Sequence, residues 1–415
     1  MVKAFDINRR KYKPIAMALA VVLLISCSPF FSMGGNAGYL ILGSTGLYFL
    51  LFANSLAQKQ ARLTNLNLNY FIISLLLLLY LFFPIRQYDR LVVAVVWLVV
   101  FLTVLMLDTA ILLLAARYFA NIIFVISLLA LAIFVIKLIG IDLPYYPYET
   151  GATGSKALFF VYPGTAVLQG QEYTIFGRSL FRVSGIFSEP GHFGVIAAIV
   201  LFMNPDILSK RKRNVIFCAA LLTLSMGFFV LIAGLLVYRF RFSHKQVVGL
   251  IVLAVMAFVV ISILPADFLD RFFLNKVSSS SDVLDARTSA EFSRFYDNYT
   301  RYGLNFFGGG RTITENFNVT SSDYRSFLLK YGIVGMALYL VWFLVITYGR
   351  KQKYVLLSFF FFLVVFVHRS WLVDYLIFLF AVYFIPLSYE LTIKKHTKTK
   401  YNPVYSNGSL QMYPV

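Results

Sequence analysis

The feature that most constrains this chain is a series of long apolar runs. A helix needs about 20 apolar residues to cross the hydrocarbon core of a membrane. The sequence predicts such helices near 15–33, 38–57, 67–84, 91–107, 118–140, 183–203, 214–225, 227–238, 246–264, 323–347, 354–368 and 371–389. Of the 415 residues, 60% are hydrophobic and 13% are charged, whereas a soluble domain has roughly 25% charged residues. The chain is therefore predicted to be an all-α polytopic membrane protein with about twelve transmembrane helices.

The pair of runs around 214–238 is the exception to this regular pattern. Each run is short, and the two meet at Ser225. They form either two thin spans or one re-entrant hairpin, and both alternatives return the chain to the same side of the membrane.

The distribution of basic residues sets the predicted orientation. Lys and Arg number 37 against 18 Asp and Glu, which gives a net charge of +19. They cluster in alternate loops, for example at 210–213 and 239–245, and such loops lie on the cytoplasmic side. Both termini are then cytoplasmic, and the charge indicates membrane topology and attraction to anionic lipid, with no nucleic-acid partner.

The predicted organisation is one integral membrane domain over residues 1–400. Two large loops, about 141–182 and 265–322, lie on the outer side. Residues 401–415 form a polar tail that is expected to be disordered. Loops of this length are usually functional or disordered.

The first candidate site is the stretch from Arg178 to Gly194, where a polar loop enters an apolar run. It places Arg178, Arg182, Glu189 and His192 at one helix entrance. Placing a charge against lipid costs several kcal/mol of insertion free energy, about 2.5–3.5 kcal/mol on insertion scales. These groups are therefore expected to face a water-filled cavity. The alternative is an interfacial cap whose arginines reach the headgroups. His192 is a core histidine with a satisfied hydrogen bond, a general base or an orienting donor.

The second candidate site is the basic part of the second outer loop. Arg287, Arg294 and Arg301 recur every seven residues, so one helical face can carry all three, and Arg311 follows. Arginine donates paired hydrogen bonds to phosphate oxygens. The alternative is a solvated helix face that nearby acidic residues neutralise.

Several further residues flank these two stretches. Asp323 opens the next helix and is either a site residue or a helix cap. Tyr146 belongs to an aromatic run in the first outer loop that can stack on sugar rings, and Arg369 lies at an outer turn beside the first site. The sequence contains no HExxH, Walker or GxSxG motif, so zinc, nucleotide and serine-hydrolase chemistry lack support. No metal site and no cofactor are predicted.

Four segments together resemble a known family. FRVSGIFSEPGHFG resembles the R-x-S-G-x-F-x-E-P-x-x-x-G stretch of O-antigen and capsule polymerases of the Wzy type. Leu222–Ser225 resembles the LT-x-S segment of that family, the FGGG at 307–310 resembles its FGxG turn, and SDYRSFLLKYGIVG resembles the helix that follows. The resemblance covers roughly residues 70–390.

The chain also departs from this family and its relatives at two positions. Ser322-Asp323 stand where the related O-antigen ligases carry a histidine, which disfavours a ligase. Met226 replaces the arginine that follows the LT-x-S segment, so no role is transferred to this position.

The resemblance implies a glycosyltransferase of the GT-C-like class that works without a metal ion. It would transfer a growing glycan from one undecaprenyl-diphosphate carrier onto another lipid-linked repeat unit, at the outer face of the bacterial inner membrane, during lipopolysaccharide or capsule synthesis. A chain-length regulator and a flippase are candidate partners. The alternatives are an O-antigen ligase and a transporter or flippase for lipid-linked oligosaccharides.

The same chemistry assigns roles to the candidate residues. Arg182 and Arg287 are expected to stabilise the departing diphosphate. Glu189, His192 or Asp323 would accept the proton of the attacking hydroxyl. The predicted substrate-binding residues are Arg178, Arg294, Arg311 and Tyr146.

Overall fold

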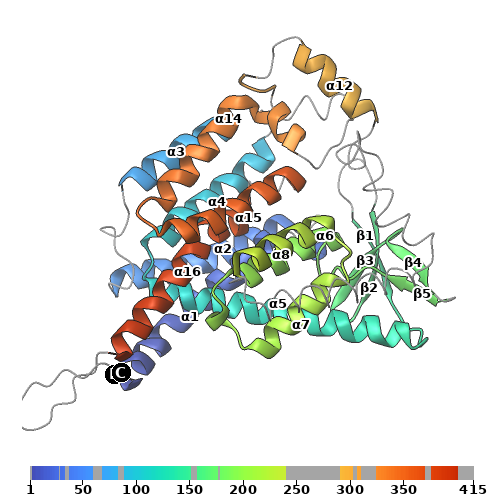
Figure 1. Ribbon diagram of the computed structural model, residues 1–415, viewed down its shortest axis with the longest axis horizontal. Coiled ribbons are helices and arrows are strands. Elements are labelled where there is room, and N and C mark those ends of the chain that lie inside the picture. Colours follow the sequence, from blue (N-terminus) through green and yellow to red (C-terminus); the bar gives the residue numbers. More distant parts are fainter. Residues whose placement is uncertain are drawn as a thin grey trace, which may run out of the picture.

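The computed structural model describes residues 2–27, 29–32, 37–58, 68–82, 88–150, 157–175, 178–239, 290–301, 306–309, 324–369 and 375–400. This part of the chain is mostly helical (Figure 1). Its helices are α1 (Val2–Ser26), α2 (Ala37–Ala57), α3 (Leu68–Phe82), α4 (Tyr88–Met106), α5 (Thr109–Leu138), α6 (Pro190–Phe202), α7 (Lys210–Leu221), α8 (Met226–Arg239), α12 (Ala290–Arg301), α14 (Tyr324–Thr347), α15 (Gln352–His368) and α16 (Leu376–Lys400).

The prediction of a membrane protein rests on the length and composition of these helices. Within the described residues, three helical segments are long and apolar enough to cross a membrane: Gly38–Ala57, Thr109–Leu138 and Tyr324–Thr347. Several other helices are apolar but shorter. The chain is therefore a helical membrane protein, while twelve spans and their orientation stay predictions. The predicted helix at 246–264 lies outside the described residues.

The all-α prediction is incomplete, because the first long loop contains five strands. They are β1 (Tyr146–Thr150), β2 (Ala157–Tyr162), β3 (Thr165–Leu168), β4 (Glu172–Ile175) and β5 (Arg178–Phe181). Strands β1, β2 and β3 form an antiparallel sheet in that order, and β4 pairs with β5. The aromatic and β-branched residues of β2 suit a half-buried pleated surface. Figure 1 shows both sheets beside the C-terminal end of α5. The start of α1 and the end of α16 lie on the opposite side of the molecule.

Two predicted helix boundaries are also wrong. The stretch 108–117 was expected to be a loop, but α5 begins at Thr109 because the Asp108 carboxylate accepts a hydrogen bond from the Ala110 backbone N–H at 2.9 Å, which caps the helix. The helix expected from residue 183 begins only at Pro190. Proline favours this first helical position because its fixed φ suits the helix and its missing N–H is not needed there.

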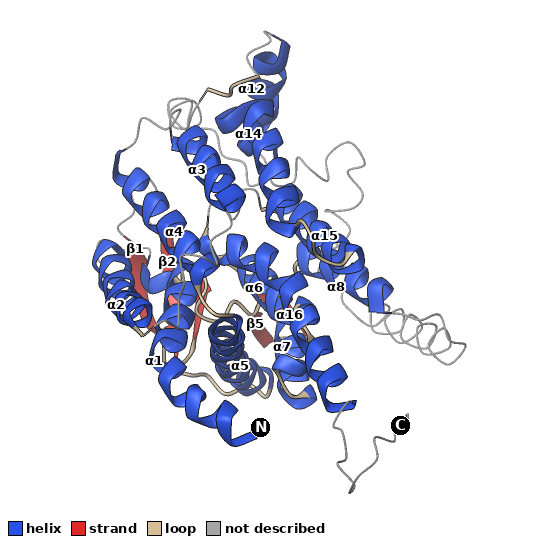
Figure 2. Cartoon of the chain, turned by 90° about the vertical axis from the view of Figure 1, so that its left-hand side faces the viewer, coloured by secondary structure: helices blue, strands red, loops and turns tan. Residues whose placement is uncertain are grey.

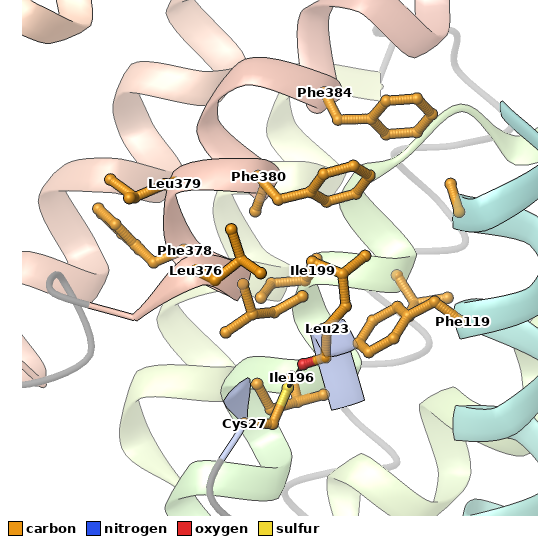
Figure 3. Close-up of a cluster of buried hydrophobic side chains, with 14 of the residues drawn as sticks. Leu23, Cys27, Phe119, Ile196, Ile199, Leu376, Phe378, Leu379, Phe380 and Phe384 are labelled. Carbon is orange, nitrogen blue, oxygen red and sulfur yellow. Dashed lines mark hydrogen bonds between the residues drawn. The ribbon is translucent and has the colours of Figure 1, made fainter. Parts of the chain in front are cut away.

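Helix α6 is the centre of the bundle. All thirteen of its residues are buried, which explains why it is apolar on every side. Figure 3 shows Ile196 and Ile199 of α6 among Leu23 of α1, Phe119 of α5 and Phe380 of α16. Figure 2 shows α5 between α1 and α7, with α3 and α14 paired farther away.

The start of α6 packs beside the middle of α5, several turns before the C-terminal end of α5. A Cβ atom at Gly185 would be 2.7 Å from Cγ2 of Ile126, so the chain just before α6 contacts α5 at that level. Ile126 precedes the last residue of α5, Leu138, by twelve positions, which corresponds to about 18 Å of helix. The last turns of α5 and the strands packed on them therefore extend beyond the start of α6.

Candidate functional site

An ion pair marks the start of α6. Nη1 of Arg369 donates a hydrogen bond to Oε2 of Glu189 at 2.5 Å. Glu189 directly precedes Pro190 and has an extended backbone, with φ −143° and ψ 148°, as expected for a residue before proline. Arg369 directly follows the last residue of α15. The Glu189 side chain is 42% exposed although the helix that follows it is entirely buried, so this carboxylate is accessible at the head of a buried helix.

Gly191 allows the arginine to approach this closely. A Cβ atom at Gly191 would collide with Nη2 of Arg369. Any larger side chain would therefore push the guanidinium away from the first turn of α6. The glycine in the EPGH segment is explained by this contact.

Gly194 brings a second element against the head of α6. A Cβ atom there would lie 3.1 Å from Cβ of Phe228, 3.2 Å from Oγ1 of Thr223 and 3.3 Å from Cβ of Ser225. These residues belong to the turn between α7 and α8 and to the first turn of α8. The N-terminal ends of α6 and α8 thus meet at one place, and both carry a partial positive charge.

Arg182 holds this turn in place. Its Nε donates to the Thr223 carbonyl at 2.9 Å, its Nη2 to the Leu224 carbonyl at 3.1 Å, and its Nη1 to Oε1 of Gln171 at 3.1 Å. Leu224 has a positive φ of 49°, a conformation that non-glycine residues adopt only when their surroundings impose it. Arg182 therefore positions the α7–α8 turn with three of its five N–H donors.

The α7–α8 turn corresponds to the predicted LT-x-S segment. It joins two helices of 12 and 14 residues, each about 18–21 Å long. Helices of this length fit both alternatives for 214–238, two thin spans or a re-entrant hairpin.

Replacing Arg182 by alanine is expected to destabilise the fold. The change leaves two turn carbonyls without their donor, and we expect a loss of about 3–6 kcal/mol, since hydrogen bonds from a charged group contribute roughly 1.5–3 kcal/mol each. Arg178, four residues earlier at the start of β5, is the matched control, because it is exposed and its Nη1 donates a single hydrogen bond of 2.8 Å, to the Leu138 carbonyl. Thermal unfolding of the purified proteins in detergent should show a clearly lower midpoint for Arg182→Ala than for Arg178→Ala. Equal midpoints would contradict the positioning role.

Other residues of the R-x-S-G segment tie the first long loop to the head of α6. The Ser184 hydroxyl donates to the Ala166 carbonyl. The Ala166 N–H donates to the Gly185 carbonyl at 2.6 Å, and the Thr165 hydroxyl donates to the same carbonyl at 3.1 Å. Strand β3 is therefore fixed to the segment that leads into α6.

Tyr173 of β4 lies in the same region. Burial raises the pKa of its hydroxyl to about 12, although the positive charge of Arg182 acts in the opposite direction. The phenol therefore stays protonated at neutral pH. It contributes a hydroxyl and no negative charge next to Arg182.

His192 has a different environment from the one expected of a base that contacts substrate. Its side chain is fully buried, and its ring packs 5.4 Å from the ring of Phe187, centroid to centroid. Its burial fits a position in the core, and the choice among the three alternatives stays a prediction. Glu189 is the accessible carboxylate at the head of α6.

The remaining candidates do not join this site in the described structure. Arg178 lies at the far end of α5, on the Leu138 carbonyl. Tyr146 is 69% exposed on β1, and Arg294 is exposed on α12. The other three candidates lie outside the described residues: Arg287, Arg311 and Asp323.

Two segments that carry the family resemblance lie against each other elsewhere in the bundle. The Gly309 N–H donates to the Leu329 carbonyl at 2.8 Å. The Tyr80 hydroxyl lies 3.0 Å from the Phe307 carbonyl and 2.8 Å from the Tyr331 carbonyl. The glycine turn is thus fixed against α14, beside the point where Gly332 interrupts that helix with a φ of 65°.

The site contains two arginines, Arg182 and Arg369, for one accessible carboxylate, Glu189. From the sequence, Arg369 was predicted to lie only beside the site. Its ion pair with Glu189 joins residues 180 positions apart, which no local pattern can indicate. Within the residues that the structure describes, no three His, Cys, Asp or Glu side chains come together in a way that could hold a metal ion. The arrangement can bind an anion and accept a proton.

Comparison with known proteins adds no assignment to this chemistry. No protein-family model, no curated protein and no solved structure matches the chain.

Proposed function

We propose that this protein is a polysaccharide polymerase of the bacterial inner membrane. It transfers a growing O-antigen or capsule glycan from an undecaprenyl-diphosphate carrier onto a lipid-linked repeat unit at the outer face. The proposal rests on the resemblance of four segments to Wzy-type polymerases and on the chemistry at the head of α6.

The single observation that carries the proposal is the ion pair between the partly exposed Glu189 carboxylate and the largely buried Arg369. A glycosyl transfer from a diphosphate carrier needs positive charge near the departing diphosphate and a base near the attacking hydroxyl. Arg369 and Glu189 supply these two groups side by side. The neighbouring N-termini of α6 and α8 add partial positive charge.

In the proposed step, an oxygen of the acceptor sugar attacks the anomeric carbon of the donor. The bond between that carbon and the diphosphate oxygen breaks, and the diphosphate leaves with the electron pair. The hydroxyl proton passes to the Glu189 carboxylate. Arg369 turns from Glu189 to the diphosphate as this substrate binds, which leaves Glu189 without its cationic partner and so makes it a stronger base.

Side chains elsewhere on the protein suit the other parts of the substrate. Exposed tyrosines of the first long loop, Tyr145 and Tyr146, are 51% and 69% accessible and offer ring faces for sugars. Exposed apolar side chains on the helices, such as Leu47 and Leu50 of α2, offer a surface that is compatible with lipid and with a polyprenyl chain.

A deletion strain tests the proposed function against its alternatives. We expect the strain to carry single repeat units at the cell surface and no polymer ladder on a polysaccharide gel. Complete polymer that is left unattached to its acceptor would instead indicate a ligase. Lipid-linked units trapped on the cytoplasmic side would indicate a transporter or flippase.

Gly191→Ala is expected to reduce polymer formation, because the added methyl group occupies the position of the Arg369 guanidinium. We expect at least a ~10-fold drop in polymer, since a displacement of about 1 Å can cost ~100-fold in rate. Gly43→Ala is the matched control, because a Cβ atom at Gly43 meets nothing within 4 Å. Ladder intensities at equal membrane levels of both variants measure the effect. Wild-type ladders from both would show that the position of Arg369 does not matter.

A further inference from the structure

A second cationic site lies at the opposite end of α6. Nη2 of Arg239, the last residue of α8, donates to the Leu201 carbonyl at 2.9 Å and to the Tyr389 hydroxyl at 3.1 Å. Leu201 belongs to the last turn of α6, whose carbonyls carry partial negative charge. Arg239 is thereby fixed where α6, α8 and α16 meet.

Arg213 lies beside it, in the first turn of α7. The two positive charges are close enough to repel each other. Among the described residues, Nε and Nη1 of Arg213 and Nε of Arg239 are buried and make no hydrogen bond. The Arg213 residue as a whole is only half-buried, so a ligand can approach it from the surface of the bundle.

The nearest acidic residues do not neutralise this pair. The charge of Asp206 acts favourably on Arg213, but no ion pair joins the two among the described residues. Glu390, next to Tyr389, accepts hydrogen bonds from Nη1 of Arg350 and from the Lys351 N–H, both at 2.9 Å. Within the part of the chain that the structure describes, the two adjacent guanidinium groups are therefore left with positive charge in excess.

Buried charged donors without acceptors are unfavourable, and adjacent like charges add to this. A group that supplies several anionic oxygens would satisfy both arginines, and the planar guanidinium fork matches phosphate. We infer that Arg213 and Arg239 form a binding site for a phosphate group at the end of α6 opposite the Glu189–Arg369 pair.

The phosphate can come from two sources that share this chemistry. One is the headgroup of an anionic phospholipid, because Arg213 follows Lys210, Arg211 and Lys212, and a basic cluster next to an apolar helix attracts such lipids. The other is a soluble phosphate. The experiment has one arm for each source.

The test uses the full-length protein, purified in detergent and depleted of lipid. Its thermal unfolding midpoint is measured against increasing phosphatidylglycerol, phosphatidylcholine and inorganic phosphate. We expect a saturable rise in the midpoint with phosphatidylglycerol or with inorganic phosphate, but not with phosphatidylcholine, whose phosphate bears a compensating cation. The anion that acts at the lower concentration identifies the source. In Arg213→Gln, the half-saturating concentration of that anion should increase at least ~10-fold, since hydrogen bonds to charged groups are the strong ones.

Arg211→Gln is the matched control, because this neighbouring arginine is exposed and its loss removes the same charge. Its half-saturating concentration should rise much less than that of Arg213→Gln, because Arg211 adds only the general attraction of the basic cluster and no donor to the site. Arg213→Lys keeps the charge without the planar fork and should give an intermediate value, which serves the test if Arg213→Gln does not fold. Equal anion responses of the Arg211 and Arg213 variants, or no saturable response of the wild type to either anion, would overturn the inference.

Discussion

Arg369→Ala is expected to abolish polymer formation while the protein still folds into the membrane. The change removes the guanidinium that pairs with Glu189 at the head of α6, and with it the positive charge proposed to stabilise the departing diphosphate. Loss of one such donor typically costs ~100–1,000-fold in rate. Gels of surface polysaccharide from a deletion strain that expresses the variant should show single repeat units in place of a ladder.

Two companion variants separate this role from a general effect of charge. Arg369→Lys keeps a point charge but loses the paired donors of the planar fork, so we expect short ladders of low intensity. Arg211→Ala removes an exposed arginine far from the site and should give the wild-type ladder. A full ladder from well-expressed Arg369→Ala would remove this residue from the mechanism.

Glu189→Gln is expected to have an effect of similar size for a different reason. The amide preserves the volume of the side chain but cannot accept the hydroxyl proton. General-base groups contribute about 100–10,000-fold, so we expect polymer to fall below detection on the same gels. The variant also loses its charge-assisted hydrogen bond to Arg369, and a modest decrease in thermal stability should accompany the loss of activity.

Glu149→Gln is the matched control for this second prediction. Glu149 is exposed on β1, and its replacement makes the same chemical change away from the head of α6. Glu189→Asp keeps a carboxylate on a shorter side chain and should recover part of the activity. If Glu189→Gln forms polymer as the wild type does, the proton goes elsewhere and Glu189 only positions Arg369.

Local sequence patterns predicted much of the helical framework. Apolar length indicated the helices that became α2, α5 and α14, and the break at Ser225 indicated the turn between α7 and α8. The start of α5 was missed because a short polar side chain, Asp108, caps the helix within two residues of α4. The strands were missed although each pairs with a neighbour in sequence, because the first long loop was treated as one irregular segment and the turn signal Pro163-Gly164 between β2 and β3 was not used.

Which residues form the site depends on contacts between segments far apart in the sequence, and local sequence patterns do not indicate such contacts. Arg182 was predicted to bind the diphosphate, yet its guanidinium lies on the carbonyls of Thr223 and Leu224, about forty positions away. Arg369 was placed only beside the site, although it contacts Glu189 directly. The sequence shows which side chains carry charge, whereas tertiary packing decides which of them meet and which stay accessible.

The proposed polymerisation at the head of α6 is tested most directly by counting the repeat units on each lipid carrier. Lipid-linked intermediates would be extracted from the deletion strain complemented with the wild type, Glu189→Gln or Glu149→Gln, at matched membrane levels, and analysed by mass spectrometry. The account predicts carriers with many repeat units for the wild type and Glu149→Gln, and carriers with one unit for Glu189→Gln. Long chains on the carrier in the Glu189→Gln strain would contradict the claim that Glu189 accepts the proton when the units are joined at the head of α6.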